Sequence, residues 1–113
     1  MKKASIVGVA ILVVLVAASA SLFGQTVADR IRQGDEYYAQ FNDEKALEEY
    51  LGATQAEPEN YEALWKTARA YFDVGDLMDP KDDRAKEKQR ALFTESFNYS
   101  KKAVRANPND TWG

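Results

Sequence analysis

The glycines and prolines beyond residue 26 constrain the fold of this chain more than any other feature. Pro58, Gly75 and Pro108 fall at the ends of segments with helical signals, and no alternating strand pattern lies between them. We expect helices over residues 27–41, 43–56, 61–74 and 91–106. The sequence therefore predicts an all-α fold.

Local signals mark where these helices begin and end. Residues 26–29 form a capping box, with a Thr hydroxyl at the N-cap and an Asp carboxylate at N3. Asn42 and Asn60 can cap the second and third helices, and Gly75 is expected to end the third. A highly charged stretch follows over residues 76–90, in which Pro80 is a candidate helix start. We interpret the stretch as an insertion, a loop that turns into an exposed extension of the fourth helix.

Small, aromatic and proline residues repeat along the chain with a period of 34 residues. In the first unit, residues 27–60, they are Gly34, Tyr37, Ala46, Tyr50, Ala53 and Pro58. In the second unit, residues 61–110, they are Leu64, Ala68, Tyr71, Ala103 and Pro108, and the insertion accounts for the extra length. This spacing resembles the tetratricopeptide repeat (TPR), in which small residues let paired helices approach closely. The sequence thus predicts a TPR-like helix-turn-helix array of two units, with residues 111–113 opening a third.

Apolar residues of the fourth helix recur at steps of three and four, which predicts one buried face. That face comprises Leu92, Phe93, Phe97, Ser100, Ala103 and Val104. Because Ser100 occupies a position that is aromatic in the repeat, we expect Phe97 or Tyr99 to supply the missing bulk.

One segment of the second unit narrows the resemblance further. Residues 62–74 (EALWKTARAYFDV) carry a Leu-Trp pair, an Ala-Arg-Ala run and an Asp. The segment resembles the regulator-of-microtubule-dynamics family of TPR-like proteins, and the resemblance covers nearly all of the chain beyond residue 26. It implies an all-helical adaptor without enzymatic activity. Eukaryotic members of that family are associated with microtubules or organelle membranes, whereas the leader of this chain indicates an exported bacterial-type relative.

The leader has the layout of a secretory signal peptide. Residues 1–3 form a positive n-region, residues 6–18 are apolar, and residues 18–20 (ASA) suit signal peptidase. We expect cleavage after Ala20, a linker over residues 21–26, and delivery to the periplasm or the medium. The alternative is an uncleaved membrane anchor over residues 4–23, which is long enough to span a bilayer.

Composition excludes several classes of function. The chain has neither Cys nor His, which rules out disulfides, thiolate zinc sites and His general bases. Loss of Lys2 and Lys3 with the leader would change the net charge from −3 to −5, and such a surface repels nucleic acid. The acidic residues between Asp73 and Asp83 lack the spacing of an EF-hand loop and are interpreted as a solvated loop. We expect no catalytic residue, metal or cofactor.

The resemblance to TPR proteins also suggests a binding groove. The first helix of each TPR pair lines a groove that takes peptides, and its outward positions are the candidate contacts. Here they are Asp35, Tyr38, Glu62, Trp65, Arg69, Phe72 and Asp73. Trp, Arg and a second aromatic at helical spacing have the composition of a binding hot spot. Alternatively, Trp65 and Phe72 pack against a further repeat, and Arg69 pairs with Asp73.

These features favour a non-enzymatic exported adaptor that binds a protein or peptide partner in the groove. Because about three repeats are usually needed for stability, we expect a longer array or an end covered by another molecule. One alternative is therefore a structural fragment that stacks on further repeats or on its own copy. Another is a solute-binding helical protein of a membrane transporter.

Cleavage of the leader is directly testable by intact mass spectrometry of the protein from its source cells. We expect the N-terminus of the native protein to be Ser21, because the small residues at positions 18 and 20 suit signal peptidase. A native protein that retains residues 1–20 and partitions into membranes would instead support the anchor.

Overall fold

The computed structural model describes residues 25–109, and this part of the chain is all-helical. The helices are α2 (Val27–Ala39), α3 (Asp43–Ala56), α4 (Tyr61–Asp76) and α5 (Asp83–Ala106). The expected leader over residues 1–20, the alternative anchor over 4–23 and the start of a third repeat at 111–113 lie outside the described residues. Within residues 25–109, none of the helices combines the length and the hydropathy that spanning a bilayer requires.

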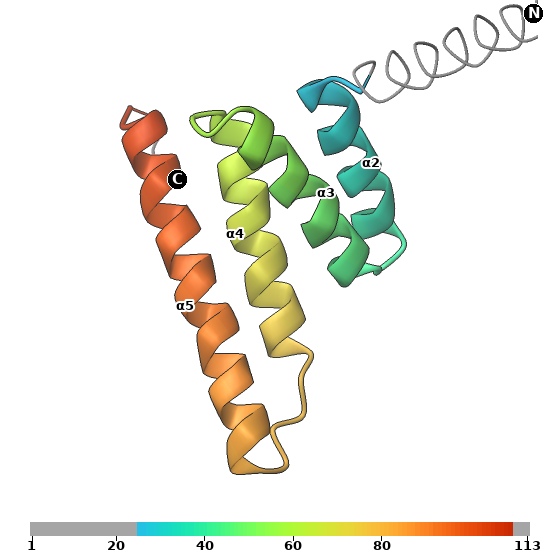
Figure 1. The fold of residues 1–113 in the computed structure, drawn as a ribbon, viewed down its shortest axis with the longest axis vertical. Helices are drawn as coiled ribbons and strands as arrows, with labels where there is room; N and C mark the ends of the chain where they lie inside the picture. The colour runs from blue at the N-terminus through green and yellow to red at the C-terminus, as the bar shows by residue number, and fades with distance from the viewer. Residues whose placement is uncertain (1–24, 110–113) are drawn as a thin grey trace, which may run out of the picture.

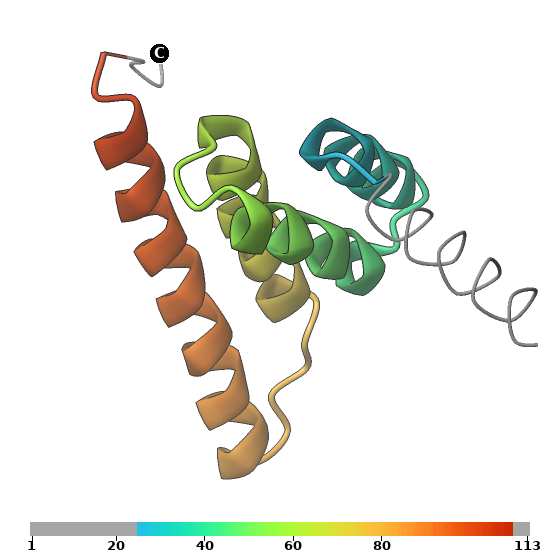
Figure 2. The ribbon, with the colours of Figure 1, turned by 45° about the horizontal axis from the view of Figure 1, so that its top comes forward.

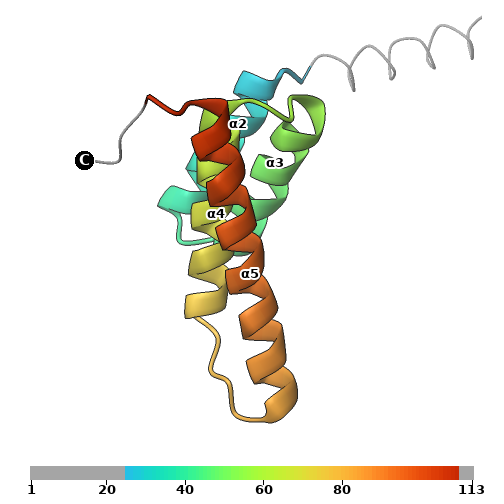
Figure 3. The same cartoon turned by 90° about the vertical axis from the view of Figure 1, so that its left-hand side faces the viewer.

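Each helix packs against the helix that precedes it in the chain. The helices therefore form a row, with α2 at one end and α5 at the other (Figures 1 and 2). The longest helix, α5, runs beside α4 and extends past its end, as the side view also shows (Figure 3). This arrangement is compatible with a helical repeat array, as the sequence predicted.

The helix starts predicted from local signals are confirmed in three of four cases. The Thr26 hydroxyl accepts a hydrogen bond from the Asp29 amide at 3.0 Å, and the Asp29 carboxylate accepts one from the Thr26 amide at 3.2 Å. Asn42 and Asn60 cap α3 and α4 through their side-chain oxygens. The prediction for Pro80 is wrong, because α5 begins later. Its N-cap is Asp82, whose carboxylate accepts from the Ala85 amide at 2.8 Å.

The predicted end of the first helix is wrong by two residues. The helix α2 stops at Ala39, and Phe41 has a φ of 59°, in the left-handed region that favours glycine. The Phe41 amide donates to the Tyr38 carbonyl, and the Asn42 amide donates to the Tyr37 carbonyl. This is the Schellman arrangement, in which glycine usually occupies the position that Phe41 holds here.

Gly75 does not end α4, contrary to the sequence-based expectation. It is a buried residue within the helix, which continues to Asp76. A Cβ atom at this position would lie 2.9 Å from Cε1 of Phe93 and 3.3 Å from Cβ of Leu92. The glycine therefore serves the close approach of α5 to α4 rather than a turn.

The core is built mainly from small residues around one large side chain. Tyr50 is fully buried, as are Ala46, Ala53, Ala63 and Ala70. Small residues at the contacts let α2, α3 and α4 approach closely. The repeat-packing positions Gly34, Leu64, Ala68 and Ala103 are also buried, Tyr37 is partly buried, and Pro58 and Pro108 are exposed.

The buried face of α5 differs from the predicted one. Phe97, Ser100 and Val104 are exposed, although Leu92, Phe93 and Ala103 are at least partly buried as expected. Tyr99 supplies the missing aromatic, because its ring stacks on Tyr71 at a centroid distance of 5.6 Å. Two polar side chains hold α5 to the backbone of α4: Ser96 donates to the Ala68 carbonyl at 2.8 Å, and Gln89 donates to the Gly75 carbonyl at 2.9 Å.

Two helical glycines provide a matched test of this packing. A Cβ at Gly34 would lie 2.5 Å from Cε1 of the buried Tyr50 ring, whereas a Cβ at Gly52 would meet only the flexible end of Arg30. We expect Gly34→Ala to lower the free energy of unfolding by about 1–2 kcal/mol, since overpacking outweighs the gain in helix propensity. Gly52→Ala should raise it by about 0.5–1 kcal/mol, because Arg30 can move aside.

Urea unfolding followed by circular dichroism measures both changes. A Gly34→Ala variant as stable as Gly52→Ala would show that the Tyr50 ring is not tightly held between α2 and α3.

Candidate functional site

A single carboxylate joins three helices. Asp35 of α2 accepts a hydrogen bond of 2.6 Å from the Tyr50 hydroxyl of α3 and one of 2.9 Å from Lys66 Nζ of α4. Lys66 also pairs with Glu62 at 3.0 Å, and its side chain is only 11 % exposed. Two carboxylates thus compensate the loss of hydration of the Lys66 ammonium group.

Beside this carboxylate lies a cation stacked on aromatic rings. The guanidinium of Arg69 lies 3.8 Å from the ring centroid of Tyr38 and 5.0 Å from that of Trp65. Tyr38 belongs to α2, whereas Arg69 and Trp65 are one turn apart on α4. Cation–π attraction therefore adds a second link between α2 and α4.

Acidic groups lie close to Tyr38 and Arg69. Burial raises the pKa of Tyr38, and a hydrogen bond with Asp73 raises it further. Partial loss of hydration raises the pKa of Asp43, as does the negative charge of Asp73. Among residues 25–109, neither Nε of Arg69 nor Oδ2 of Asp73 has a hydrogen-bond partner. The alternative pairing of Arg69 with Asp73 is not among the ion pairs of the described residues, and Arg69 instead stacks on Tyr38.

The structure brings together most of the candidate groove residues. Asp35, Tyr38, Trp65, Arg69 and Asp73 form one group between α2 and α4, and Glu62 joins it through Lys66. We call these residues, with Asp43, Tyr50 and Lys66, the α2/α4 cluster. Phe72 does not join them, since its ring packs against Phe93 of α5 at a centroid distance of 5.3 Å.

Sequence reasoning missed three members of the cluster. Lys66 is one of them, and its spacing of four residues from Glu62 was the only signal of a partner. Tyr50 was identified as a packing aromatic, but its hydroxyl also donates to Asp35. Asp43 lies in the first turn of α3, where the helix dipole favours a carboxylate, so its position in the sequence gave no sign of a further role.

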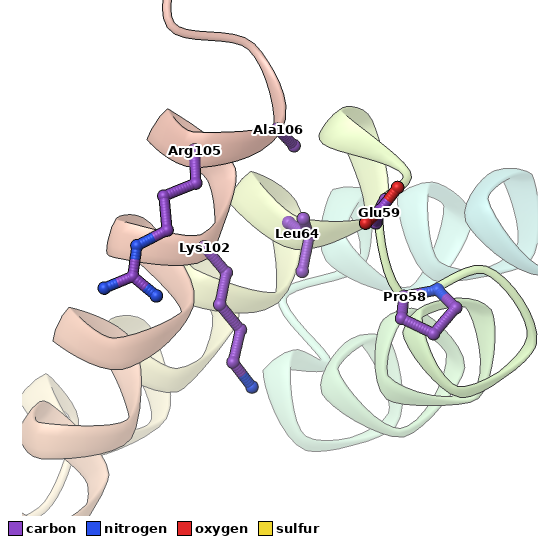
Figure 4. A pocket seen from close by; sticks show the side chains of 6 residues that line it. All are labelled: Pro58, Glu59, Leu64, Lys102, Arg105 and Ala106. Carbon is purple, nitrogen blue, oxygen red and sulfur yellow. The ribbon is translucent and has the colours of Figure 1, made fainter.

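A hollow of about 330 Å³ lies between the start of α4 and the end of α5 (Figure 4). Lys102 and Arg105 extend from α5 on one side, and Pro58 and Glu59 lie on the loop between α3 and α4. Leu64, one of the repeat-packing residues, lines it but is buried. Because cations and a carboxylate both border it, this hollow selects no single ligand charge.

The acidic residues between Asp73 and Asp83 have separate roles. Within the described part of the chain, no group of three or more acidic side chains is arranged to hold a metal ion. Asp73 belongs to the α2/α4 cluster, Asp82 caps α5, and Asp79 pairs with Lys81 at 3.6 Å.

The hydrogen bond from Tyr50 to Asp35 predicts a pH dependence of stability. Burial raises the pKa of Tyr50 well above its usual value, and the hydrogen bond to Asp35 adds to this effect. An unfolded tyrosine titrates near pH 10, so above about pH 10 the unfolded state binds fewer protons than the folded state and stability falls. We expect Tyr50→Phe to cost about 1–2 kcal/mol at neutral pH and to flatten the loss of stability above pH 10.

Denaturant unfolding of both proteins between neutral pH and pH 11 checks this prediction. Identical alkaline slopes would contradict the assignment of the bond.

One comparison with known proteins gave a match. Residues 30–112 match the family described as Regulator of microtubule dynamics protein 1-3. Neither curated proteins nor solved structures gave a match. The family match spans most of the chain and includes α3, α4 and α5 entirely. The chain therefore belongs to the family of regulator of microtubule dynamics proteins 1-3.

Proposed function

We propose that this protein is an exported, non-enzymatic adaptor with a TPR-like fold, and that it binds a segment of a partner protein on the α2/α4 cluster. The leader supports export, and the spacing of small and aromatic residues supports the repeat register. In this proposal, α2 and α4 are the first helices of the two repeats and line the peptide groove.

The stacking of Arg69 between Tyr38 and Trp65 carries the proposal. Tyr, Trp and Arg are the residue types that dominate protein interfaces, and here they are held together before any partner arrives. All three side chains are only partly buried, so a partner can reach them. A prearranged surface costs less conformational entropy on binding than a mobile one.

The charges of the cluster indicate the chemistry of the partner. Four carboxylates, those of Asp35, Asp43, Glu62 and Asp73, face the two cations Lys66 and Arg69. The excess of negative charge favours a segment that carries Lys or Arg. The adaptor role requires no catalytic group, and the carboxylates serve to hold helices together and to attract the partner.

Selection of peptides from a random display library against residues 21–113 tests the proposal. Peptides that bind should be rich in basic residues. The double substitution Trp65→Ala with Arg69→Glu should weaken their binding at least about tenfold, because it removes two of the three stacked side chains. Circular dichroism should show unchanged helicity.

The chain offers a matched control on α5. Lys101 lies 4.9 Å from the ring centroid of Phe97, so this pair repeats the aromatic–cation spacing of Trp65 and Arg69. The substitutions Phe97→Ala with Lys101→Glu should leave peptide binding unchanged. Equal weakening by both double variants would argue against the α2/α4 cluster as the binding surface.

A second candidate function is structural. Phe97 and Val104 on α5 are 63 % and 51 % exposed, and in a repeat array such a face is covered by the next helix. Stacking on a further repeat or on a second copy would cover it. Sedimentation equilibrium distinguishes the two roles, because self-association makes the apparent mass rise with concentration.

A further inference from the structure

We propose that the cleft between α3 and the start of α5 is a second binding surface. It binds an amphipathic helix of a partner protein, and this helix carries basic residues beside its apolar face. The cleft has a volume of about 600 Å³, and it is also lined by Val74 near the end of α4 and by Leu77 and Met78 of the following loop. None of the residues that line the cleft belongs to the α2/α4 cluster, so the proposal does not depend on that groove. We call it the α3/α5 cleft.

The lining of the α3/α5 cleft suits the apolar face of a helix. Side chains from three helices and the following loop meet there, and the apolar ones are Leu47, Leu51, Val74, Leu77, Met78 and Leu92. An amphipathic helix that lays its apolar face into such a groove is a common mode of peptide recognition. The apolar lining therefore fits a helix better than an extended polar segment.

An adjoining hollow extends the same surface toward the turn between α2 and α3. It shares Glu44, Val74 and Leu77 with the cleft and adds Phe41. Phe41 is 89 % exposed and Leu77 is 73 % exposed. Two large apolar side chains that neighbour a cleft and do little for the core indicate an interaction surface.

The backbone of Phe41 supports this interpretation independently. Its φ of 59° is costly for a bulky residue, and glycine would relieve the cost. The Phe41 side chain contributes little to the core, because it is almost fully exposed. Strain of this kind is usually found where a residue serves function rather than stability.

The charged stretch over residues 76–90, which interrupts the repeat, contributes to the α5 side of the cleft. Lys88 lies in the part of α5 contributed by that stretch, and Leu92 is one turn further on. This side of the cleft is fixed in place by the Gln89 hydrogen bond to the Gly75 carbonyl and by the Asp82 cap. The insertion thus turns a repeat contact into a preformed cleft.

The rim of the cleft determines the charge of the occupant. Glu44 and Glu48 lie along α3, Asp43 borders the adjoining hollow, and Lys88 is the single cation among the lining residues. A helix with Lys or Arg beside its apolar face would be attracted to this rim, and one with Glu or Asp would be repelled. The rim also disfavours a second copy, because the protein is itself acidic.

The test uses residues 21–113 and two defined probes. One is a fluorescent amphipathic peptide of Leu and Lys, about 18 residues or five helical turns long, and the other replaces every Lys with Glu. Fluorescence anisotropy should show saturable binding of the Lys peptide and none of the Glu peptide. Glu44→Lys with Glu48→Lys should weaken binding of the Lys peptide about tenfold. Phe41→Gly and Leu77→Ser should each weaken it similarly.

The variants separate binding from folding. Phe41→Gly places glycine where the backbone favours it, so its melting temperature should be unchanged or higher. Glu36→Lys with Glu95→Lys makes the same change in net charge at exposed positions outside the cleft and should alter binding less than twofold.

Four results would overturn the proposal. The Lys peptide fails to saturate, or Glu36→Lys with Glu95→Lys weakens it as much as the cleft variants do. Alternatively, only Trp65→Ala with Arg69→Glu abolishes binding, which would place the helix on the α2/α4 cluster. Finally, Leu77→Ser converts a concentration-dependent dimer to a monomer, which would make a second copy the occupant.

Discussion

The carboxylate of Asp35 is the contact on which the arrangement of α2, α3 and α4 depends. It accepts hydrogen bonds from Tyr50 and Lys66, which belong to the two following helices. The core around it consists largely of alanine, so apolar burial alone specifies the positions of α2 and α4 weakly. The polar contact supplies that specificity, and it sets the spacing at which Arg69 can stack on Tyr38.

Features that depend on nearby residues could be predicted from the sequence. The caps formed by Thr26, Asn42 and Asn60 are hydrogen bonds over three residues, and each is present. The all-helical fold also follows from the spacing of breaks and small residues. The family resemblance rests on one short segment of α4, and the match over residues 30–112 agrees with it.

Features set by distant contacts could not be predicted. Lysine is usually exposed, and Lys66 is buried where two carboxylates receive it, one of which, Asp35, is 31 residues away. Gly75 was predicted to end α4 because glycine often ends helices. Its role is to leave room for Phe93 of α5, and that contact is not visible in the local sequence. The buried face of α5 was predicted wrongly, because Ser96 and Gln89 hold this helix by hydrogen bonds to carbonyls of α4. The spacing of hydrophobic residues does not reveal such bonds.

Native-state hydrogen exchange of wild type and Asp35→Ala tests the central role of this carboxylate most directly. Repeat-like helices contact only their neighbours, so loss of the contact should affect α2 more than α5. We predict that the amides of α2 lose about 10- to 100-fold of their protection, as expected for a lost charged hydrogen-bond pair, while those of α5 change much less. Unchanged protection in α2, or an equal loss in both helices, would contradict the account.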